Sequence, residues 1–128
     1  MPVSPDPDPT RIGVGLVQER LQEVDRHIRE RDFGAIVGLL KPLADRPDLD
    51  LPPDLAWQLN FLLALAYTER HDNANDLEAA RIYFAVAEAN AHAASQGILT
   101  YFNRARLEDI CGDHERAATY RAKAWALS

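Results

Sequence analysis

The sequence predicts an all-α fold made of three antiparallel helical hairpins. Apolar residues recur at steps of three and four along most of the chain, which is the period of a helix with one buried face. No alternating, valine-rich run typical of a strand is present. The helical pattern also repeats, because Ala80 and Ala87 lie seven residues apart and Ala117 and Ala124 stand in the same relation 37 positions later.

The first hairpin is expected to follow a tail. Residues 1–10 contain four of the eight prolines, and this density predicts a disordered segment before a single domain at 11–128. Thr10 is a suitable cap for a first helix that runs to about Arg31, and Asp32 can cap a second helix in which Pro42 kinks or shortens the last turn. This hairpin covers about 11–45.

The second hairpin, at about 54–94, begins with Pro52 or Pro53 in the first turn of a helix. Between Leu55 and Tyr67 only Gln58 and Asn60 are strongly polar, so this helix should lie in the middle of the stack. Asp76 is expected to cap the second helix of the pair.

The third hairpin, at about 97–127, is expected to begin where Gly97 breaks the preceding helix. Gly112 should end its first helix and Asp113 should cap the last one, which finishes near Leu127.

Composition excludes several classes of partner. The net charge of −6 and the pI near 5.1 disfavour nucleic acid and membrane surfaces, whose recognition depends on clustered Lys and Arg. No uncharged apolar run approaches the roughly 20 residues that cross a bilayer, and the N-terminus lacks the pattern of a signal peptide. A single cysteine, Cys111, cannot form an internal disulfide. We therefore expect a cytoplasmic protein.

The last two hairpins resemble tetratricopeptide repeats (TPR), whose unit of about 34 residues places small and aromatic residues at set positions. Two positions depart from the pattern, because Glu108 replaces a tyrosine and Arg121 an aromatic residue. The first hairpin matches only loosely, through Asp32, Phe33 and Ala35. The matching positions are Leu63, Ala64, Tyr67, Ala80, Phe84 and Ala87 in the second hairpin and Tyr101, Ala105, Gly112, Asp113, Ala117 and Ala124 in the third.

The resemblance implies a short right-handed solenoid whose first helices line a concave groove for a peptide or helix of a protein partner. Leu62 and Leu99 stand where the family's carboxylate clamp has Asn and Lys, so that clamp is not expected, although Asn103 is compatible with it. Phe61, Leu62 and Phe102 also fit ordinary core positions equally well. The implied groove residues are Gln58, Phe61, Leu62, Leu65, Glu69, Leu99, Phe102, Asn103, Arg106 and Asp109.

No set of residues indicates catalysis, a metal site or a cofactor. Glu88 and His92 share a helical face, but two ligands do not make a metal site. The glycines at 13 and 15 do not follow a strand, and Asp72 and Asp76 lack the glycine and glutamate of a calcium loop. We therefore expect a non-enzymatic interaction module that acts as an adaptor, a chaperone-like protein or an assembly factor.

The predicted last helix offers a second hypothesis. The exposed side of this helix would carry Ala118, Ala122 and Trp125, and no further helix covers it. Trp125 is expected to pack back on the fifth helix. The alternative is that these residues form a contact with a second copy, which would make the protein a self-associating scaffold subunit or homodimer.

Overall fold

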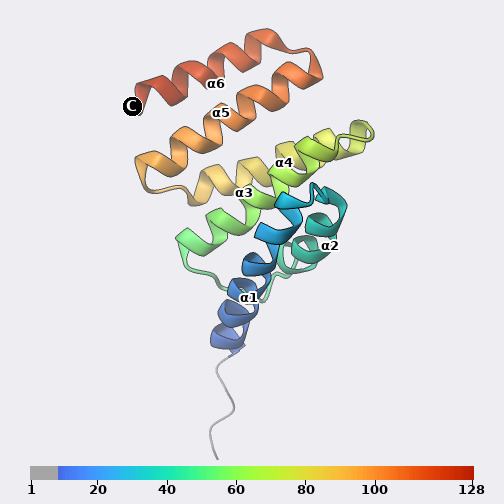
Figure 1. Cartoon of the computed structure of the whole chain (residues 1–128). Coiled ribbons are helices and arrows are strands. Elements are labelled where there is room, and N and C mark those ends of the chain that lie inside the picture. The colour runs from blue at the N-terminus through green and yellow to red at the C-terminus, as the bar shows by residue number, and fades with distance from the viewer. Residues whose placement is uncertain (1–8) are drawn as a thin grey trace, which may run out of the picture.

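The computed structural model describes residues 9–128, with side chains from residue 13 onward, and this part of the chain is all-α (Figure 1). The predicted tail at 1–10 therefore lies almost wholly outside the described residues. The six helices are α1 (Pro9–Arg29), α2 (Phe33–Ala44), α3 (Pro53–Arg70), α4 (Ala74–Asn90), α5 (Ala94–Cys111) and α6 (His114–Ala126). None of the described helices is both long enough and apolar enough to cross a membrane.

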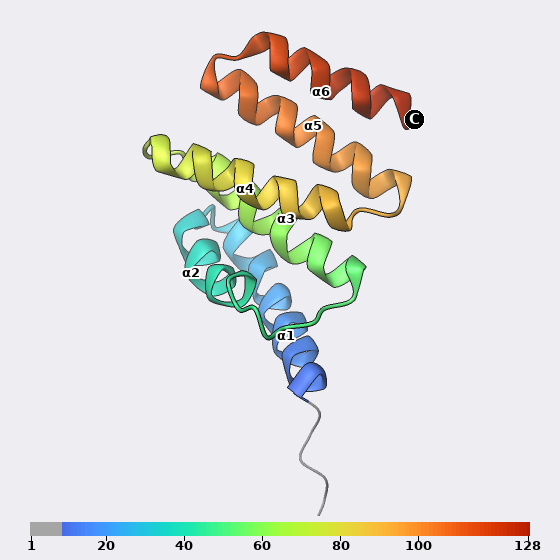
Figure 2. The same ribbon diagram turned by 180° about the vertical axis from the view of Figure 1, so that it is seen from behind.

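The helices pack in chain order, from α1 and α2 at one end to α5 and α6 at the other (Figures 1 and 2). Each hairpin pairs its own two helices, and the first helix of the next hairpin contacts both of them. Thus α3 contacts α1 and α2, and α5 contacts α3 and α4. Within the described residues, the first hairpin makes no backbone contact with the third. The middle hairpin therefore holds the other two together.

Small residues allow the helices to approach closely, as the repeated alanine pattern predicted. Ala80, Ala87, Ala117 and Ala124 are all fully buried. Phe84, also fully buried, fills the space beside the alanines of α4. Helix α3 lies in the middle of the stack, as expected from its apolar character, and most of its residues from 59 onward are buried. Close approach at alanine and filling by a neighbouring large side chain is the usual arrangement of packed helices.

Several predicted helix ends are confirmed. Asp32 Oδ1 accepts a hydrogen bond of 3.1 Å from the backbone N–H of Ala35 at the start of α2. Asp113 Oδ1 accepts one of 3.0 Å from the N–H of Arg116 at the start of α6. Gly112 takes the left-handed conformation at φ 87° that ends α5 and that glycine adopts at low cost.

The predicted cap of α4 is wrong. The helix begins at Ala74, and Asn73 rather than Asp76 is its cap, since the Asn73 side chain accepts a bond of 3.2 Å from the N–H of Asp76. Asp76 instead binds Arg70 at the end of α3, with distances of 3.0 and 2.7 Å to the guanidinium nitrogens. Asn and Asp are both good N-cap residues. Here the Asp76 carboxylate is engaged by Arg70, and Asn73 acts as the cap.

The predicted break at Gly97 is also wrong, because α4 ends at Asn90 and Gly97 lies inside the first turns of α5. A Cβ atom at position 97 would lie 2.8 Å from Leu127 Cδ1. The glycine therefore lies in contact with the Leu127 side chain at the end of the chain and does not end a helix. At the other end, α1 begins at Pro9, one residue before the predicted Thr10 cap, in keeping with the preference of proline for first turns.

Candidate partner-binding surface

The first helices of the three hairpins share one outward-facing surface, which we call the A-face. Two contacts between helices define it. Gln58 and Leu62 of α3 line a groove together with residues of α1, and Glu69 of α3 forms an ion pair with Arg106 of α5. The helical period places Leu65 in the same stripe of α3, and Leu99 and Asn103 in the same stripe of α5 as Arg106. Most of the predicted groove residues therefore lie on one face.

The part of the A-face between α1 and α3 contains a groove of about 480 Å³. Its apolar lining comes from Leu21, Leu55 and Leu62, and its polar lining consists of three amides and one carboxylate. These polar side chains form no hydrogen bond or ion pair with any other described residue. They are Gln18, Gln22, Asp25 and Gln58.

The part of the A-face between α3 and α5 differs, because its polar groups bind one another. Arg106 donates to Glu69, and the Asn103 amide nitrogen donates to the Leu99 carbonyl oxygen at 2.8 Å. Asp109 of α5 contacts α6 instead of α3, since it binds His114 Nδ1 at 2.8 Å and accepts a bond of 2.7 Å from Arg121, and these contacts lower the pKa of its carboxyl group. The predicted anchors of this region are therefore already engaged within the chain.

Phe61 was expected either in the groove or in the core, and the structure places it in the core. Its side chain is only 8% exposed and stacks on Trp57 at a centroid distance of 5.0 Å. Its ring also meets the edge of Phe84 at 6.0 Å. A hydrogen bond of 2.9 Å from Trp57 Nε1 to Thr100 Oγ1 fixes this aromatic group against α5. Phe61 belongs to the core because it packs between Trp57 of its own helix and Phe84 of α4.

The apolar residues of α5 and α6 form a separate, partly exposed group. Leu99 is 47% exposed, whereas Phe102 is half-buried. The Phe102 ring meets Trp125 edge to face at 5.5 Å, so Trp125 does pack back on the fifth helix as expected. Trp125 nevertheless remains 67% exposed, and Ala118 and Ala122 are exposed beside it on α6.

The departure at Glu108 has a structural cause that sequence reasoning missed. Glu108 accepts two hydrogen bonds of 2.9 Å from Arg81, across the contact between α4 and α5. The Glu108 side chain is 3% exposed and that of Arg81 is 31% exposed. The paired carboxylate raises the pKa of Arg81. The sequence did carry a signal for this ion pair. Glu108 stands at a position where an aromatic residue was expected, and a buried carboxylate there requires a cationic partner.

The other residues that the sequence analysis considered, as metal ligands or as a reactive thiol, make ordinary structural contacts. Glu88 pairs with Arg104 at 2.9 Å, whereas His92 lies 3.3 Å from Asp54, so the two do not share a site. Within residues 9–128, no three His, Cys, Asp or Glu side chains lie close enough together to hold a metal ion. Burial raises the pKa of the Cys111 thiol, which favours its neutral form.

Comparisons of the chain with protein-family models, with curated proteins and with solved structures found no match.

Proposed function

We propose that this protein is a small, non-enzymatic interaction module that binds a peptide or helix of a protein partner on its A-face, as an adaptor or assembly factor does. One observation carries the proposal. Gln18, Gln22, Asp25 and Gln58 line a groove beside three leucines, and their side chains form no hydrogen bond or ion pair with the described residues.

The chemistry of this groove suits a polypeptide. A glutamine amide offers both a donor and an acceptor, which is what a peptide backbone requires. Leu21, Leu55 and Leu62 supply an apolar surface for the side chains of the same segment. Polar groups beside an apolar strip can therefore bind both the backbone and the side chains of a peptide. Asp25 is the charged group of this groove, so a basic residue in the bound segment is favoured.

The order of helix contacts supports the finer proposal of a TPR-like solenoid. In such stacks each hairpin contacts only its neighbours, and here the first hairpin does not contact the third within the described residues. The buried alanines of α4 and α6 occupy the small-residue positions of the repeat. The irregular positions are Glu108 and Arg121, both of which form ion pairs.

The test uses peptides selected from a random displayed library against the wild-type protein. Binding of the selected peptides is then measured with the double variant Gln22→Arg/Gln58→Arg. A matched control is Asn75→Arg/Thr119→Arg, which adds the same charge at exposed positions on α4 and α6. We expect the first variant to lose binding and the control to keep it. Equal binding to both variants would exclude the groove as the site.

A second candidate is self-association through α6, favoured by the exposure of Trp125 beside Ala118 and Ala122. An exposed apolar surface of this kind is common at contacts between subunits. Light scattering at increasing protein concentration tests it, with Trp125→Ser as the matched variant. A mass that stays monomeric at all concentrations would reject this candidate. A dimer that Trp125→Ser dissociates would support it.

A further inference from the structure

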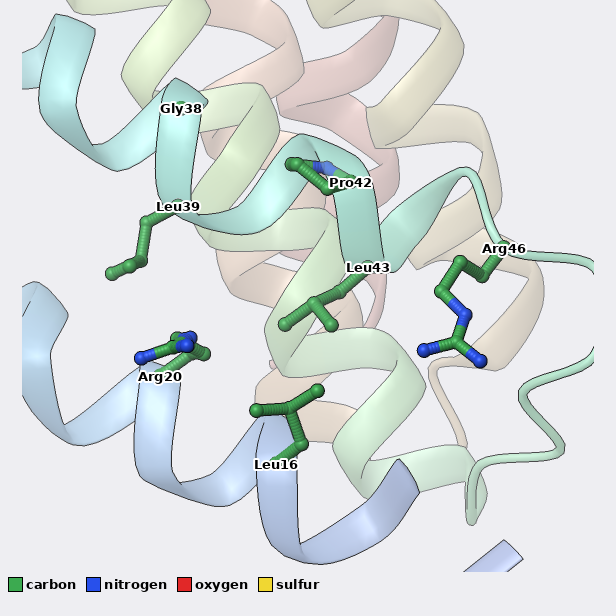
Figure 3. A pocket seen from close by; sticks show the side chains of 7 residues that line it. All are labelled: Leu16, Arg20, Gly38, Leu39, Pro42, Leu43 and Arg46. Carbon is green, nitrogen blue, oxygen red and sulfur yellow. The ribbon is translucent and has the colours of Figure 1, made fainter. Parts of the chain in front are cut away.

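A second cleft lies between α1 and α2, on the exposed side of the first hairpin (Figure 3). Its volume is about 540 Å³, and α3 lies behind it. Leu16, Leu39 and Leu43 form most of its apolar lining, together with Gly38 and Pro42. The cleft is separate from the A-face groove, because the two share no lining residue.

The charge of this cleft is unusual for the protein. Its ionisable lining groups are two arginines, although the chain as a whole carries a net charge of −6. In Figure 3, Leu16 and Leu43 lie between Arg20 on one side and Arg46 on the other. The cleft therefore combines an apolar middle with a guanidinium group at each side.

Both guanidinium groups keep donors that their own partners do not use. Arg20 contacts Glu23 through one nitrogen at 3.5 Å, a distance at the limit for a hydrogen bond. Arg46 binds Asp48 through Nε at 3.1 Å and Nη2 at 2.6 Å, which leaves Nη1 for a second acceptor. A guanidinium group has five N–H donors, so each arginine can bind a further carboxylate.

We propose that this cleft binds a segment of a partner protein in which bulky aliphatic side chains are flanked by carboxylates. The aliphatic side chains would contact Leu16, Leu39 and Leu43, and carboxylates on either side would bind Arg20 and Arg46. A single small amphipathic acid fits less well, because it has one carboxylate and the arginines stand on opposite sides of the cleft. Such molecules are also usually enclosed by their sites, whereas Gly38 and Pro42 leave this cleft exposed to solvent.

The two glycines at positions 38 and 15 provide a matched pair of variants. A Cβ atom at either position would meet nothing within 4 Å, and both lie within helices. Replacement of a helical glycine by glutamate improves helix propensity, so both variants should fold. Gly38→Glu places a carboxylate in the cleft, beside the proposed sites of the partner's carboxylates. Gly15→Glu adds the same charge on α1, at a position that does not line the cleft.

The probe is a fluorescein-labelled peptide with two central leucines between pairs of glutamates, measured by fluorescence anisotropy. We expect the wild type and Gly15→Glu to bind it equally and Gly38→Glu to bind it about tenfold more weakly or not at all. Arg20→Gln/Arg46→Gln should weaken binding by a similar factor. A peptide with lysines in place of the glutamates should not bind.

Three results would overturn the proposal. They are equal loss in the Gly15→Glu and Gly38→Glu variants, equal binding of the lysine peptide, and no binding of the glutamate peptide to the wild type. In that last case, binding of decanoate as a second probe would assign the cleft to a small amphipathic acid instead of a protein segment.

Discussion

The two junctions between hairpins are built from different chemistry. The first hairpin meets α3 through apolar side chains such as Val17, Leu21 and Leu40, all buried in one continuous core. The third hairpin meets α3 and α4 largely through polar contacts, and Leu107 is the residue of α5 in that core. These contacts are Asp54 with Gln96, Trp57 with Thr100, Glu69 with Arg106, Arg81 with Glu108, and Glu88 with Arg104.

This difference decides which polar groups are available to a partner. At the second junction the polar groups are used to hold the stack together. At the first junction, buried apolar side chains hold the hairpins together. The amides of Gln18, Gln22 and Gln58 make no hydrogen bond within the described residues. Polar groups that stabilise a fold and polar groups that can bind a ligand thus occupy neighbouring parts of one face.

The largest expected effect concerns the apolar junction. Leu40 is fully buried, so Leu40→Ala should lower the free energy of unfolding by about 3 kcal/mol, within the range for buried leucines. The loss should hardly change with salt, because no charge is involved. Urea unfolding at low and high salt measures both. Leu39, half-buried on the same helix, is the control, and an equal loss for Leu39→Ala would contradict this description of the junction.

The polar junction can be tested at its most buried contact. Glu108→Gln removes the charge that Arg81 binds, and we expect a loss of about 2 kcal/mol, since one partner of a buried pair remains without compensation. Glu78→Gln is the matched control, because Glu78 is also bound by Arg81, at 3.2 Å, but is exposed. That variant should lose about 0.5 kcal/mol or less. Equal losses in urea unfolding would show that burial of Glu108 is not important.

A pH titration tests the middle hairpin, to which both junctions attach. Hydrogen bonds from Arg70 lower the pKa of the Asp76 carboxyl group, so its stabilising effect is complete above the ordinary aspartate pKa of about 3.9. This effect is lost as the pH falls through the lower, folded-state pKa. Asp76→Asn should therefore be less stable than the wild type at pH 7, by about 1–2 kcal/mol, and should lose less stability in acid. If urea unfolding shows that the wild type and Asp76→Asn lose stability equally as the pH falls, the stabilising role given to the ionised Asp76 is wrong.

The smallest effect is expected on the exposed part of the second junction. Arg106 is 49% exposed, so its ion pair with Glu69 should contribute about 0.5 kcal/mol, and less at high salt. Urea unfolding of the Arg106→Gln variant measures the contribution of this ion pair to stability. A loss as large as that of Glu108→Gln would mean that exposed pairs, and not only buried ones, hold the third hairpin.

Local patterns predicted much of this fold. The period of apolar residues placed the six helices, the spacing of alanines identified the close contacts, and Asp32 and Asp113 were recognisable as caps. The errors arose where a contact with a neighbouring segment bears on the outcome. Arg70, at the end of the preceding helix, binds the Asp76 carboxylate, and the Leu127 side chain lies against Gly97 inside α5.

The candidate surface was predictable in position but not in chemistry. The helical period predicts Gln58, Leu62 and Leu65 on one stripe of α3, and Gln58 and Leu62 line the same groove. Whether a polar group on that stripe is free depends on pairs such as Glu69 with Arg106, which are 37 residues apart in the sequence. The contribution of α1 was missed, although Gln18, Gln22 and Asp25 recur at steps of three and four and carried a readable signal.

The central claim is that the amides between α1 and α3, and not those between α3 and α5, bind the partner. Two-dimensional ¹H–¹⁵N NMR observes side-chain NH₂ groups directly, so a selected peptide can be titrated into the labelled protein. We predict that the NH₂ signals of Gln18, Gln22 and Gln58 shift while that of Asn103 stays in place. Shifts concentrated at Asn103 and along α5, with the three glutamine signals unchanged, would contradict the account.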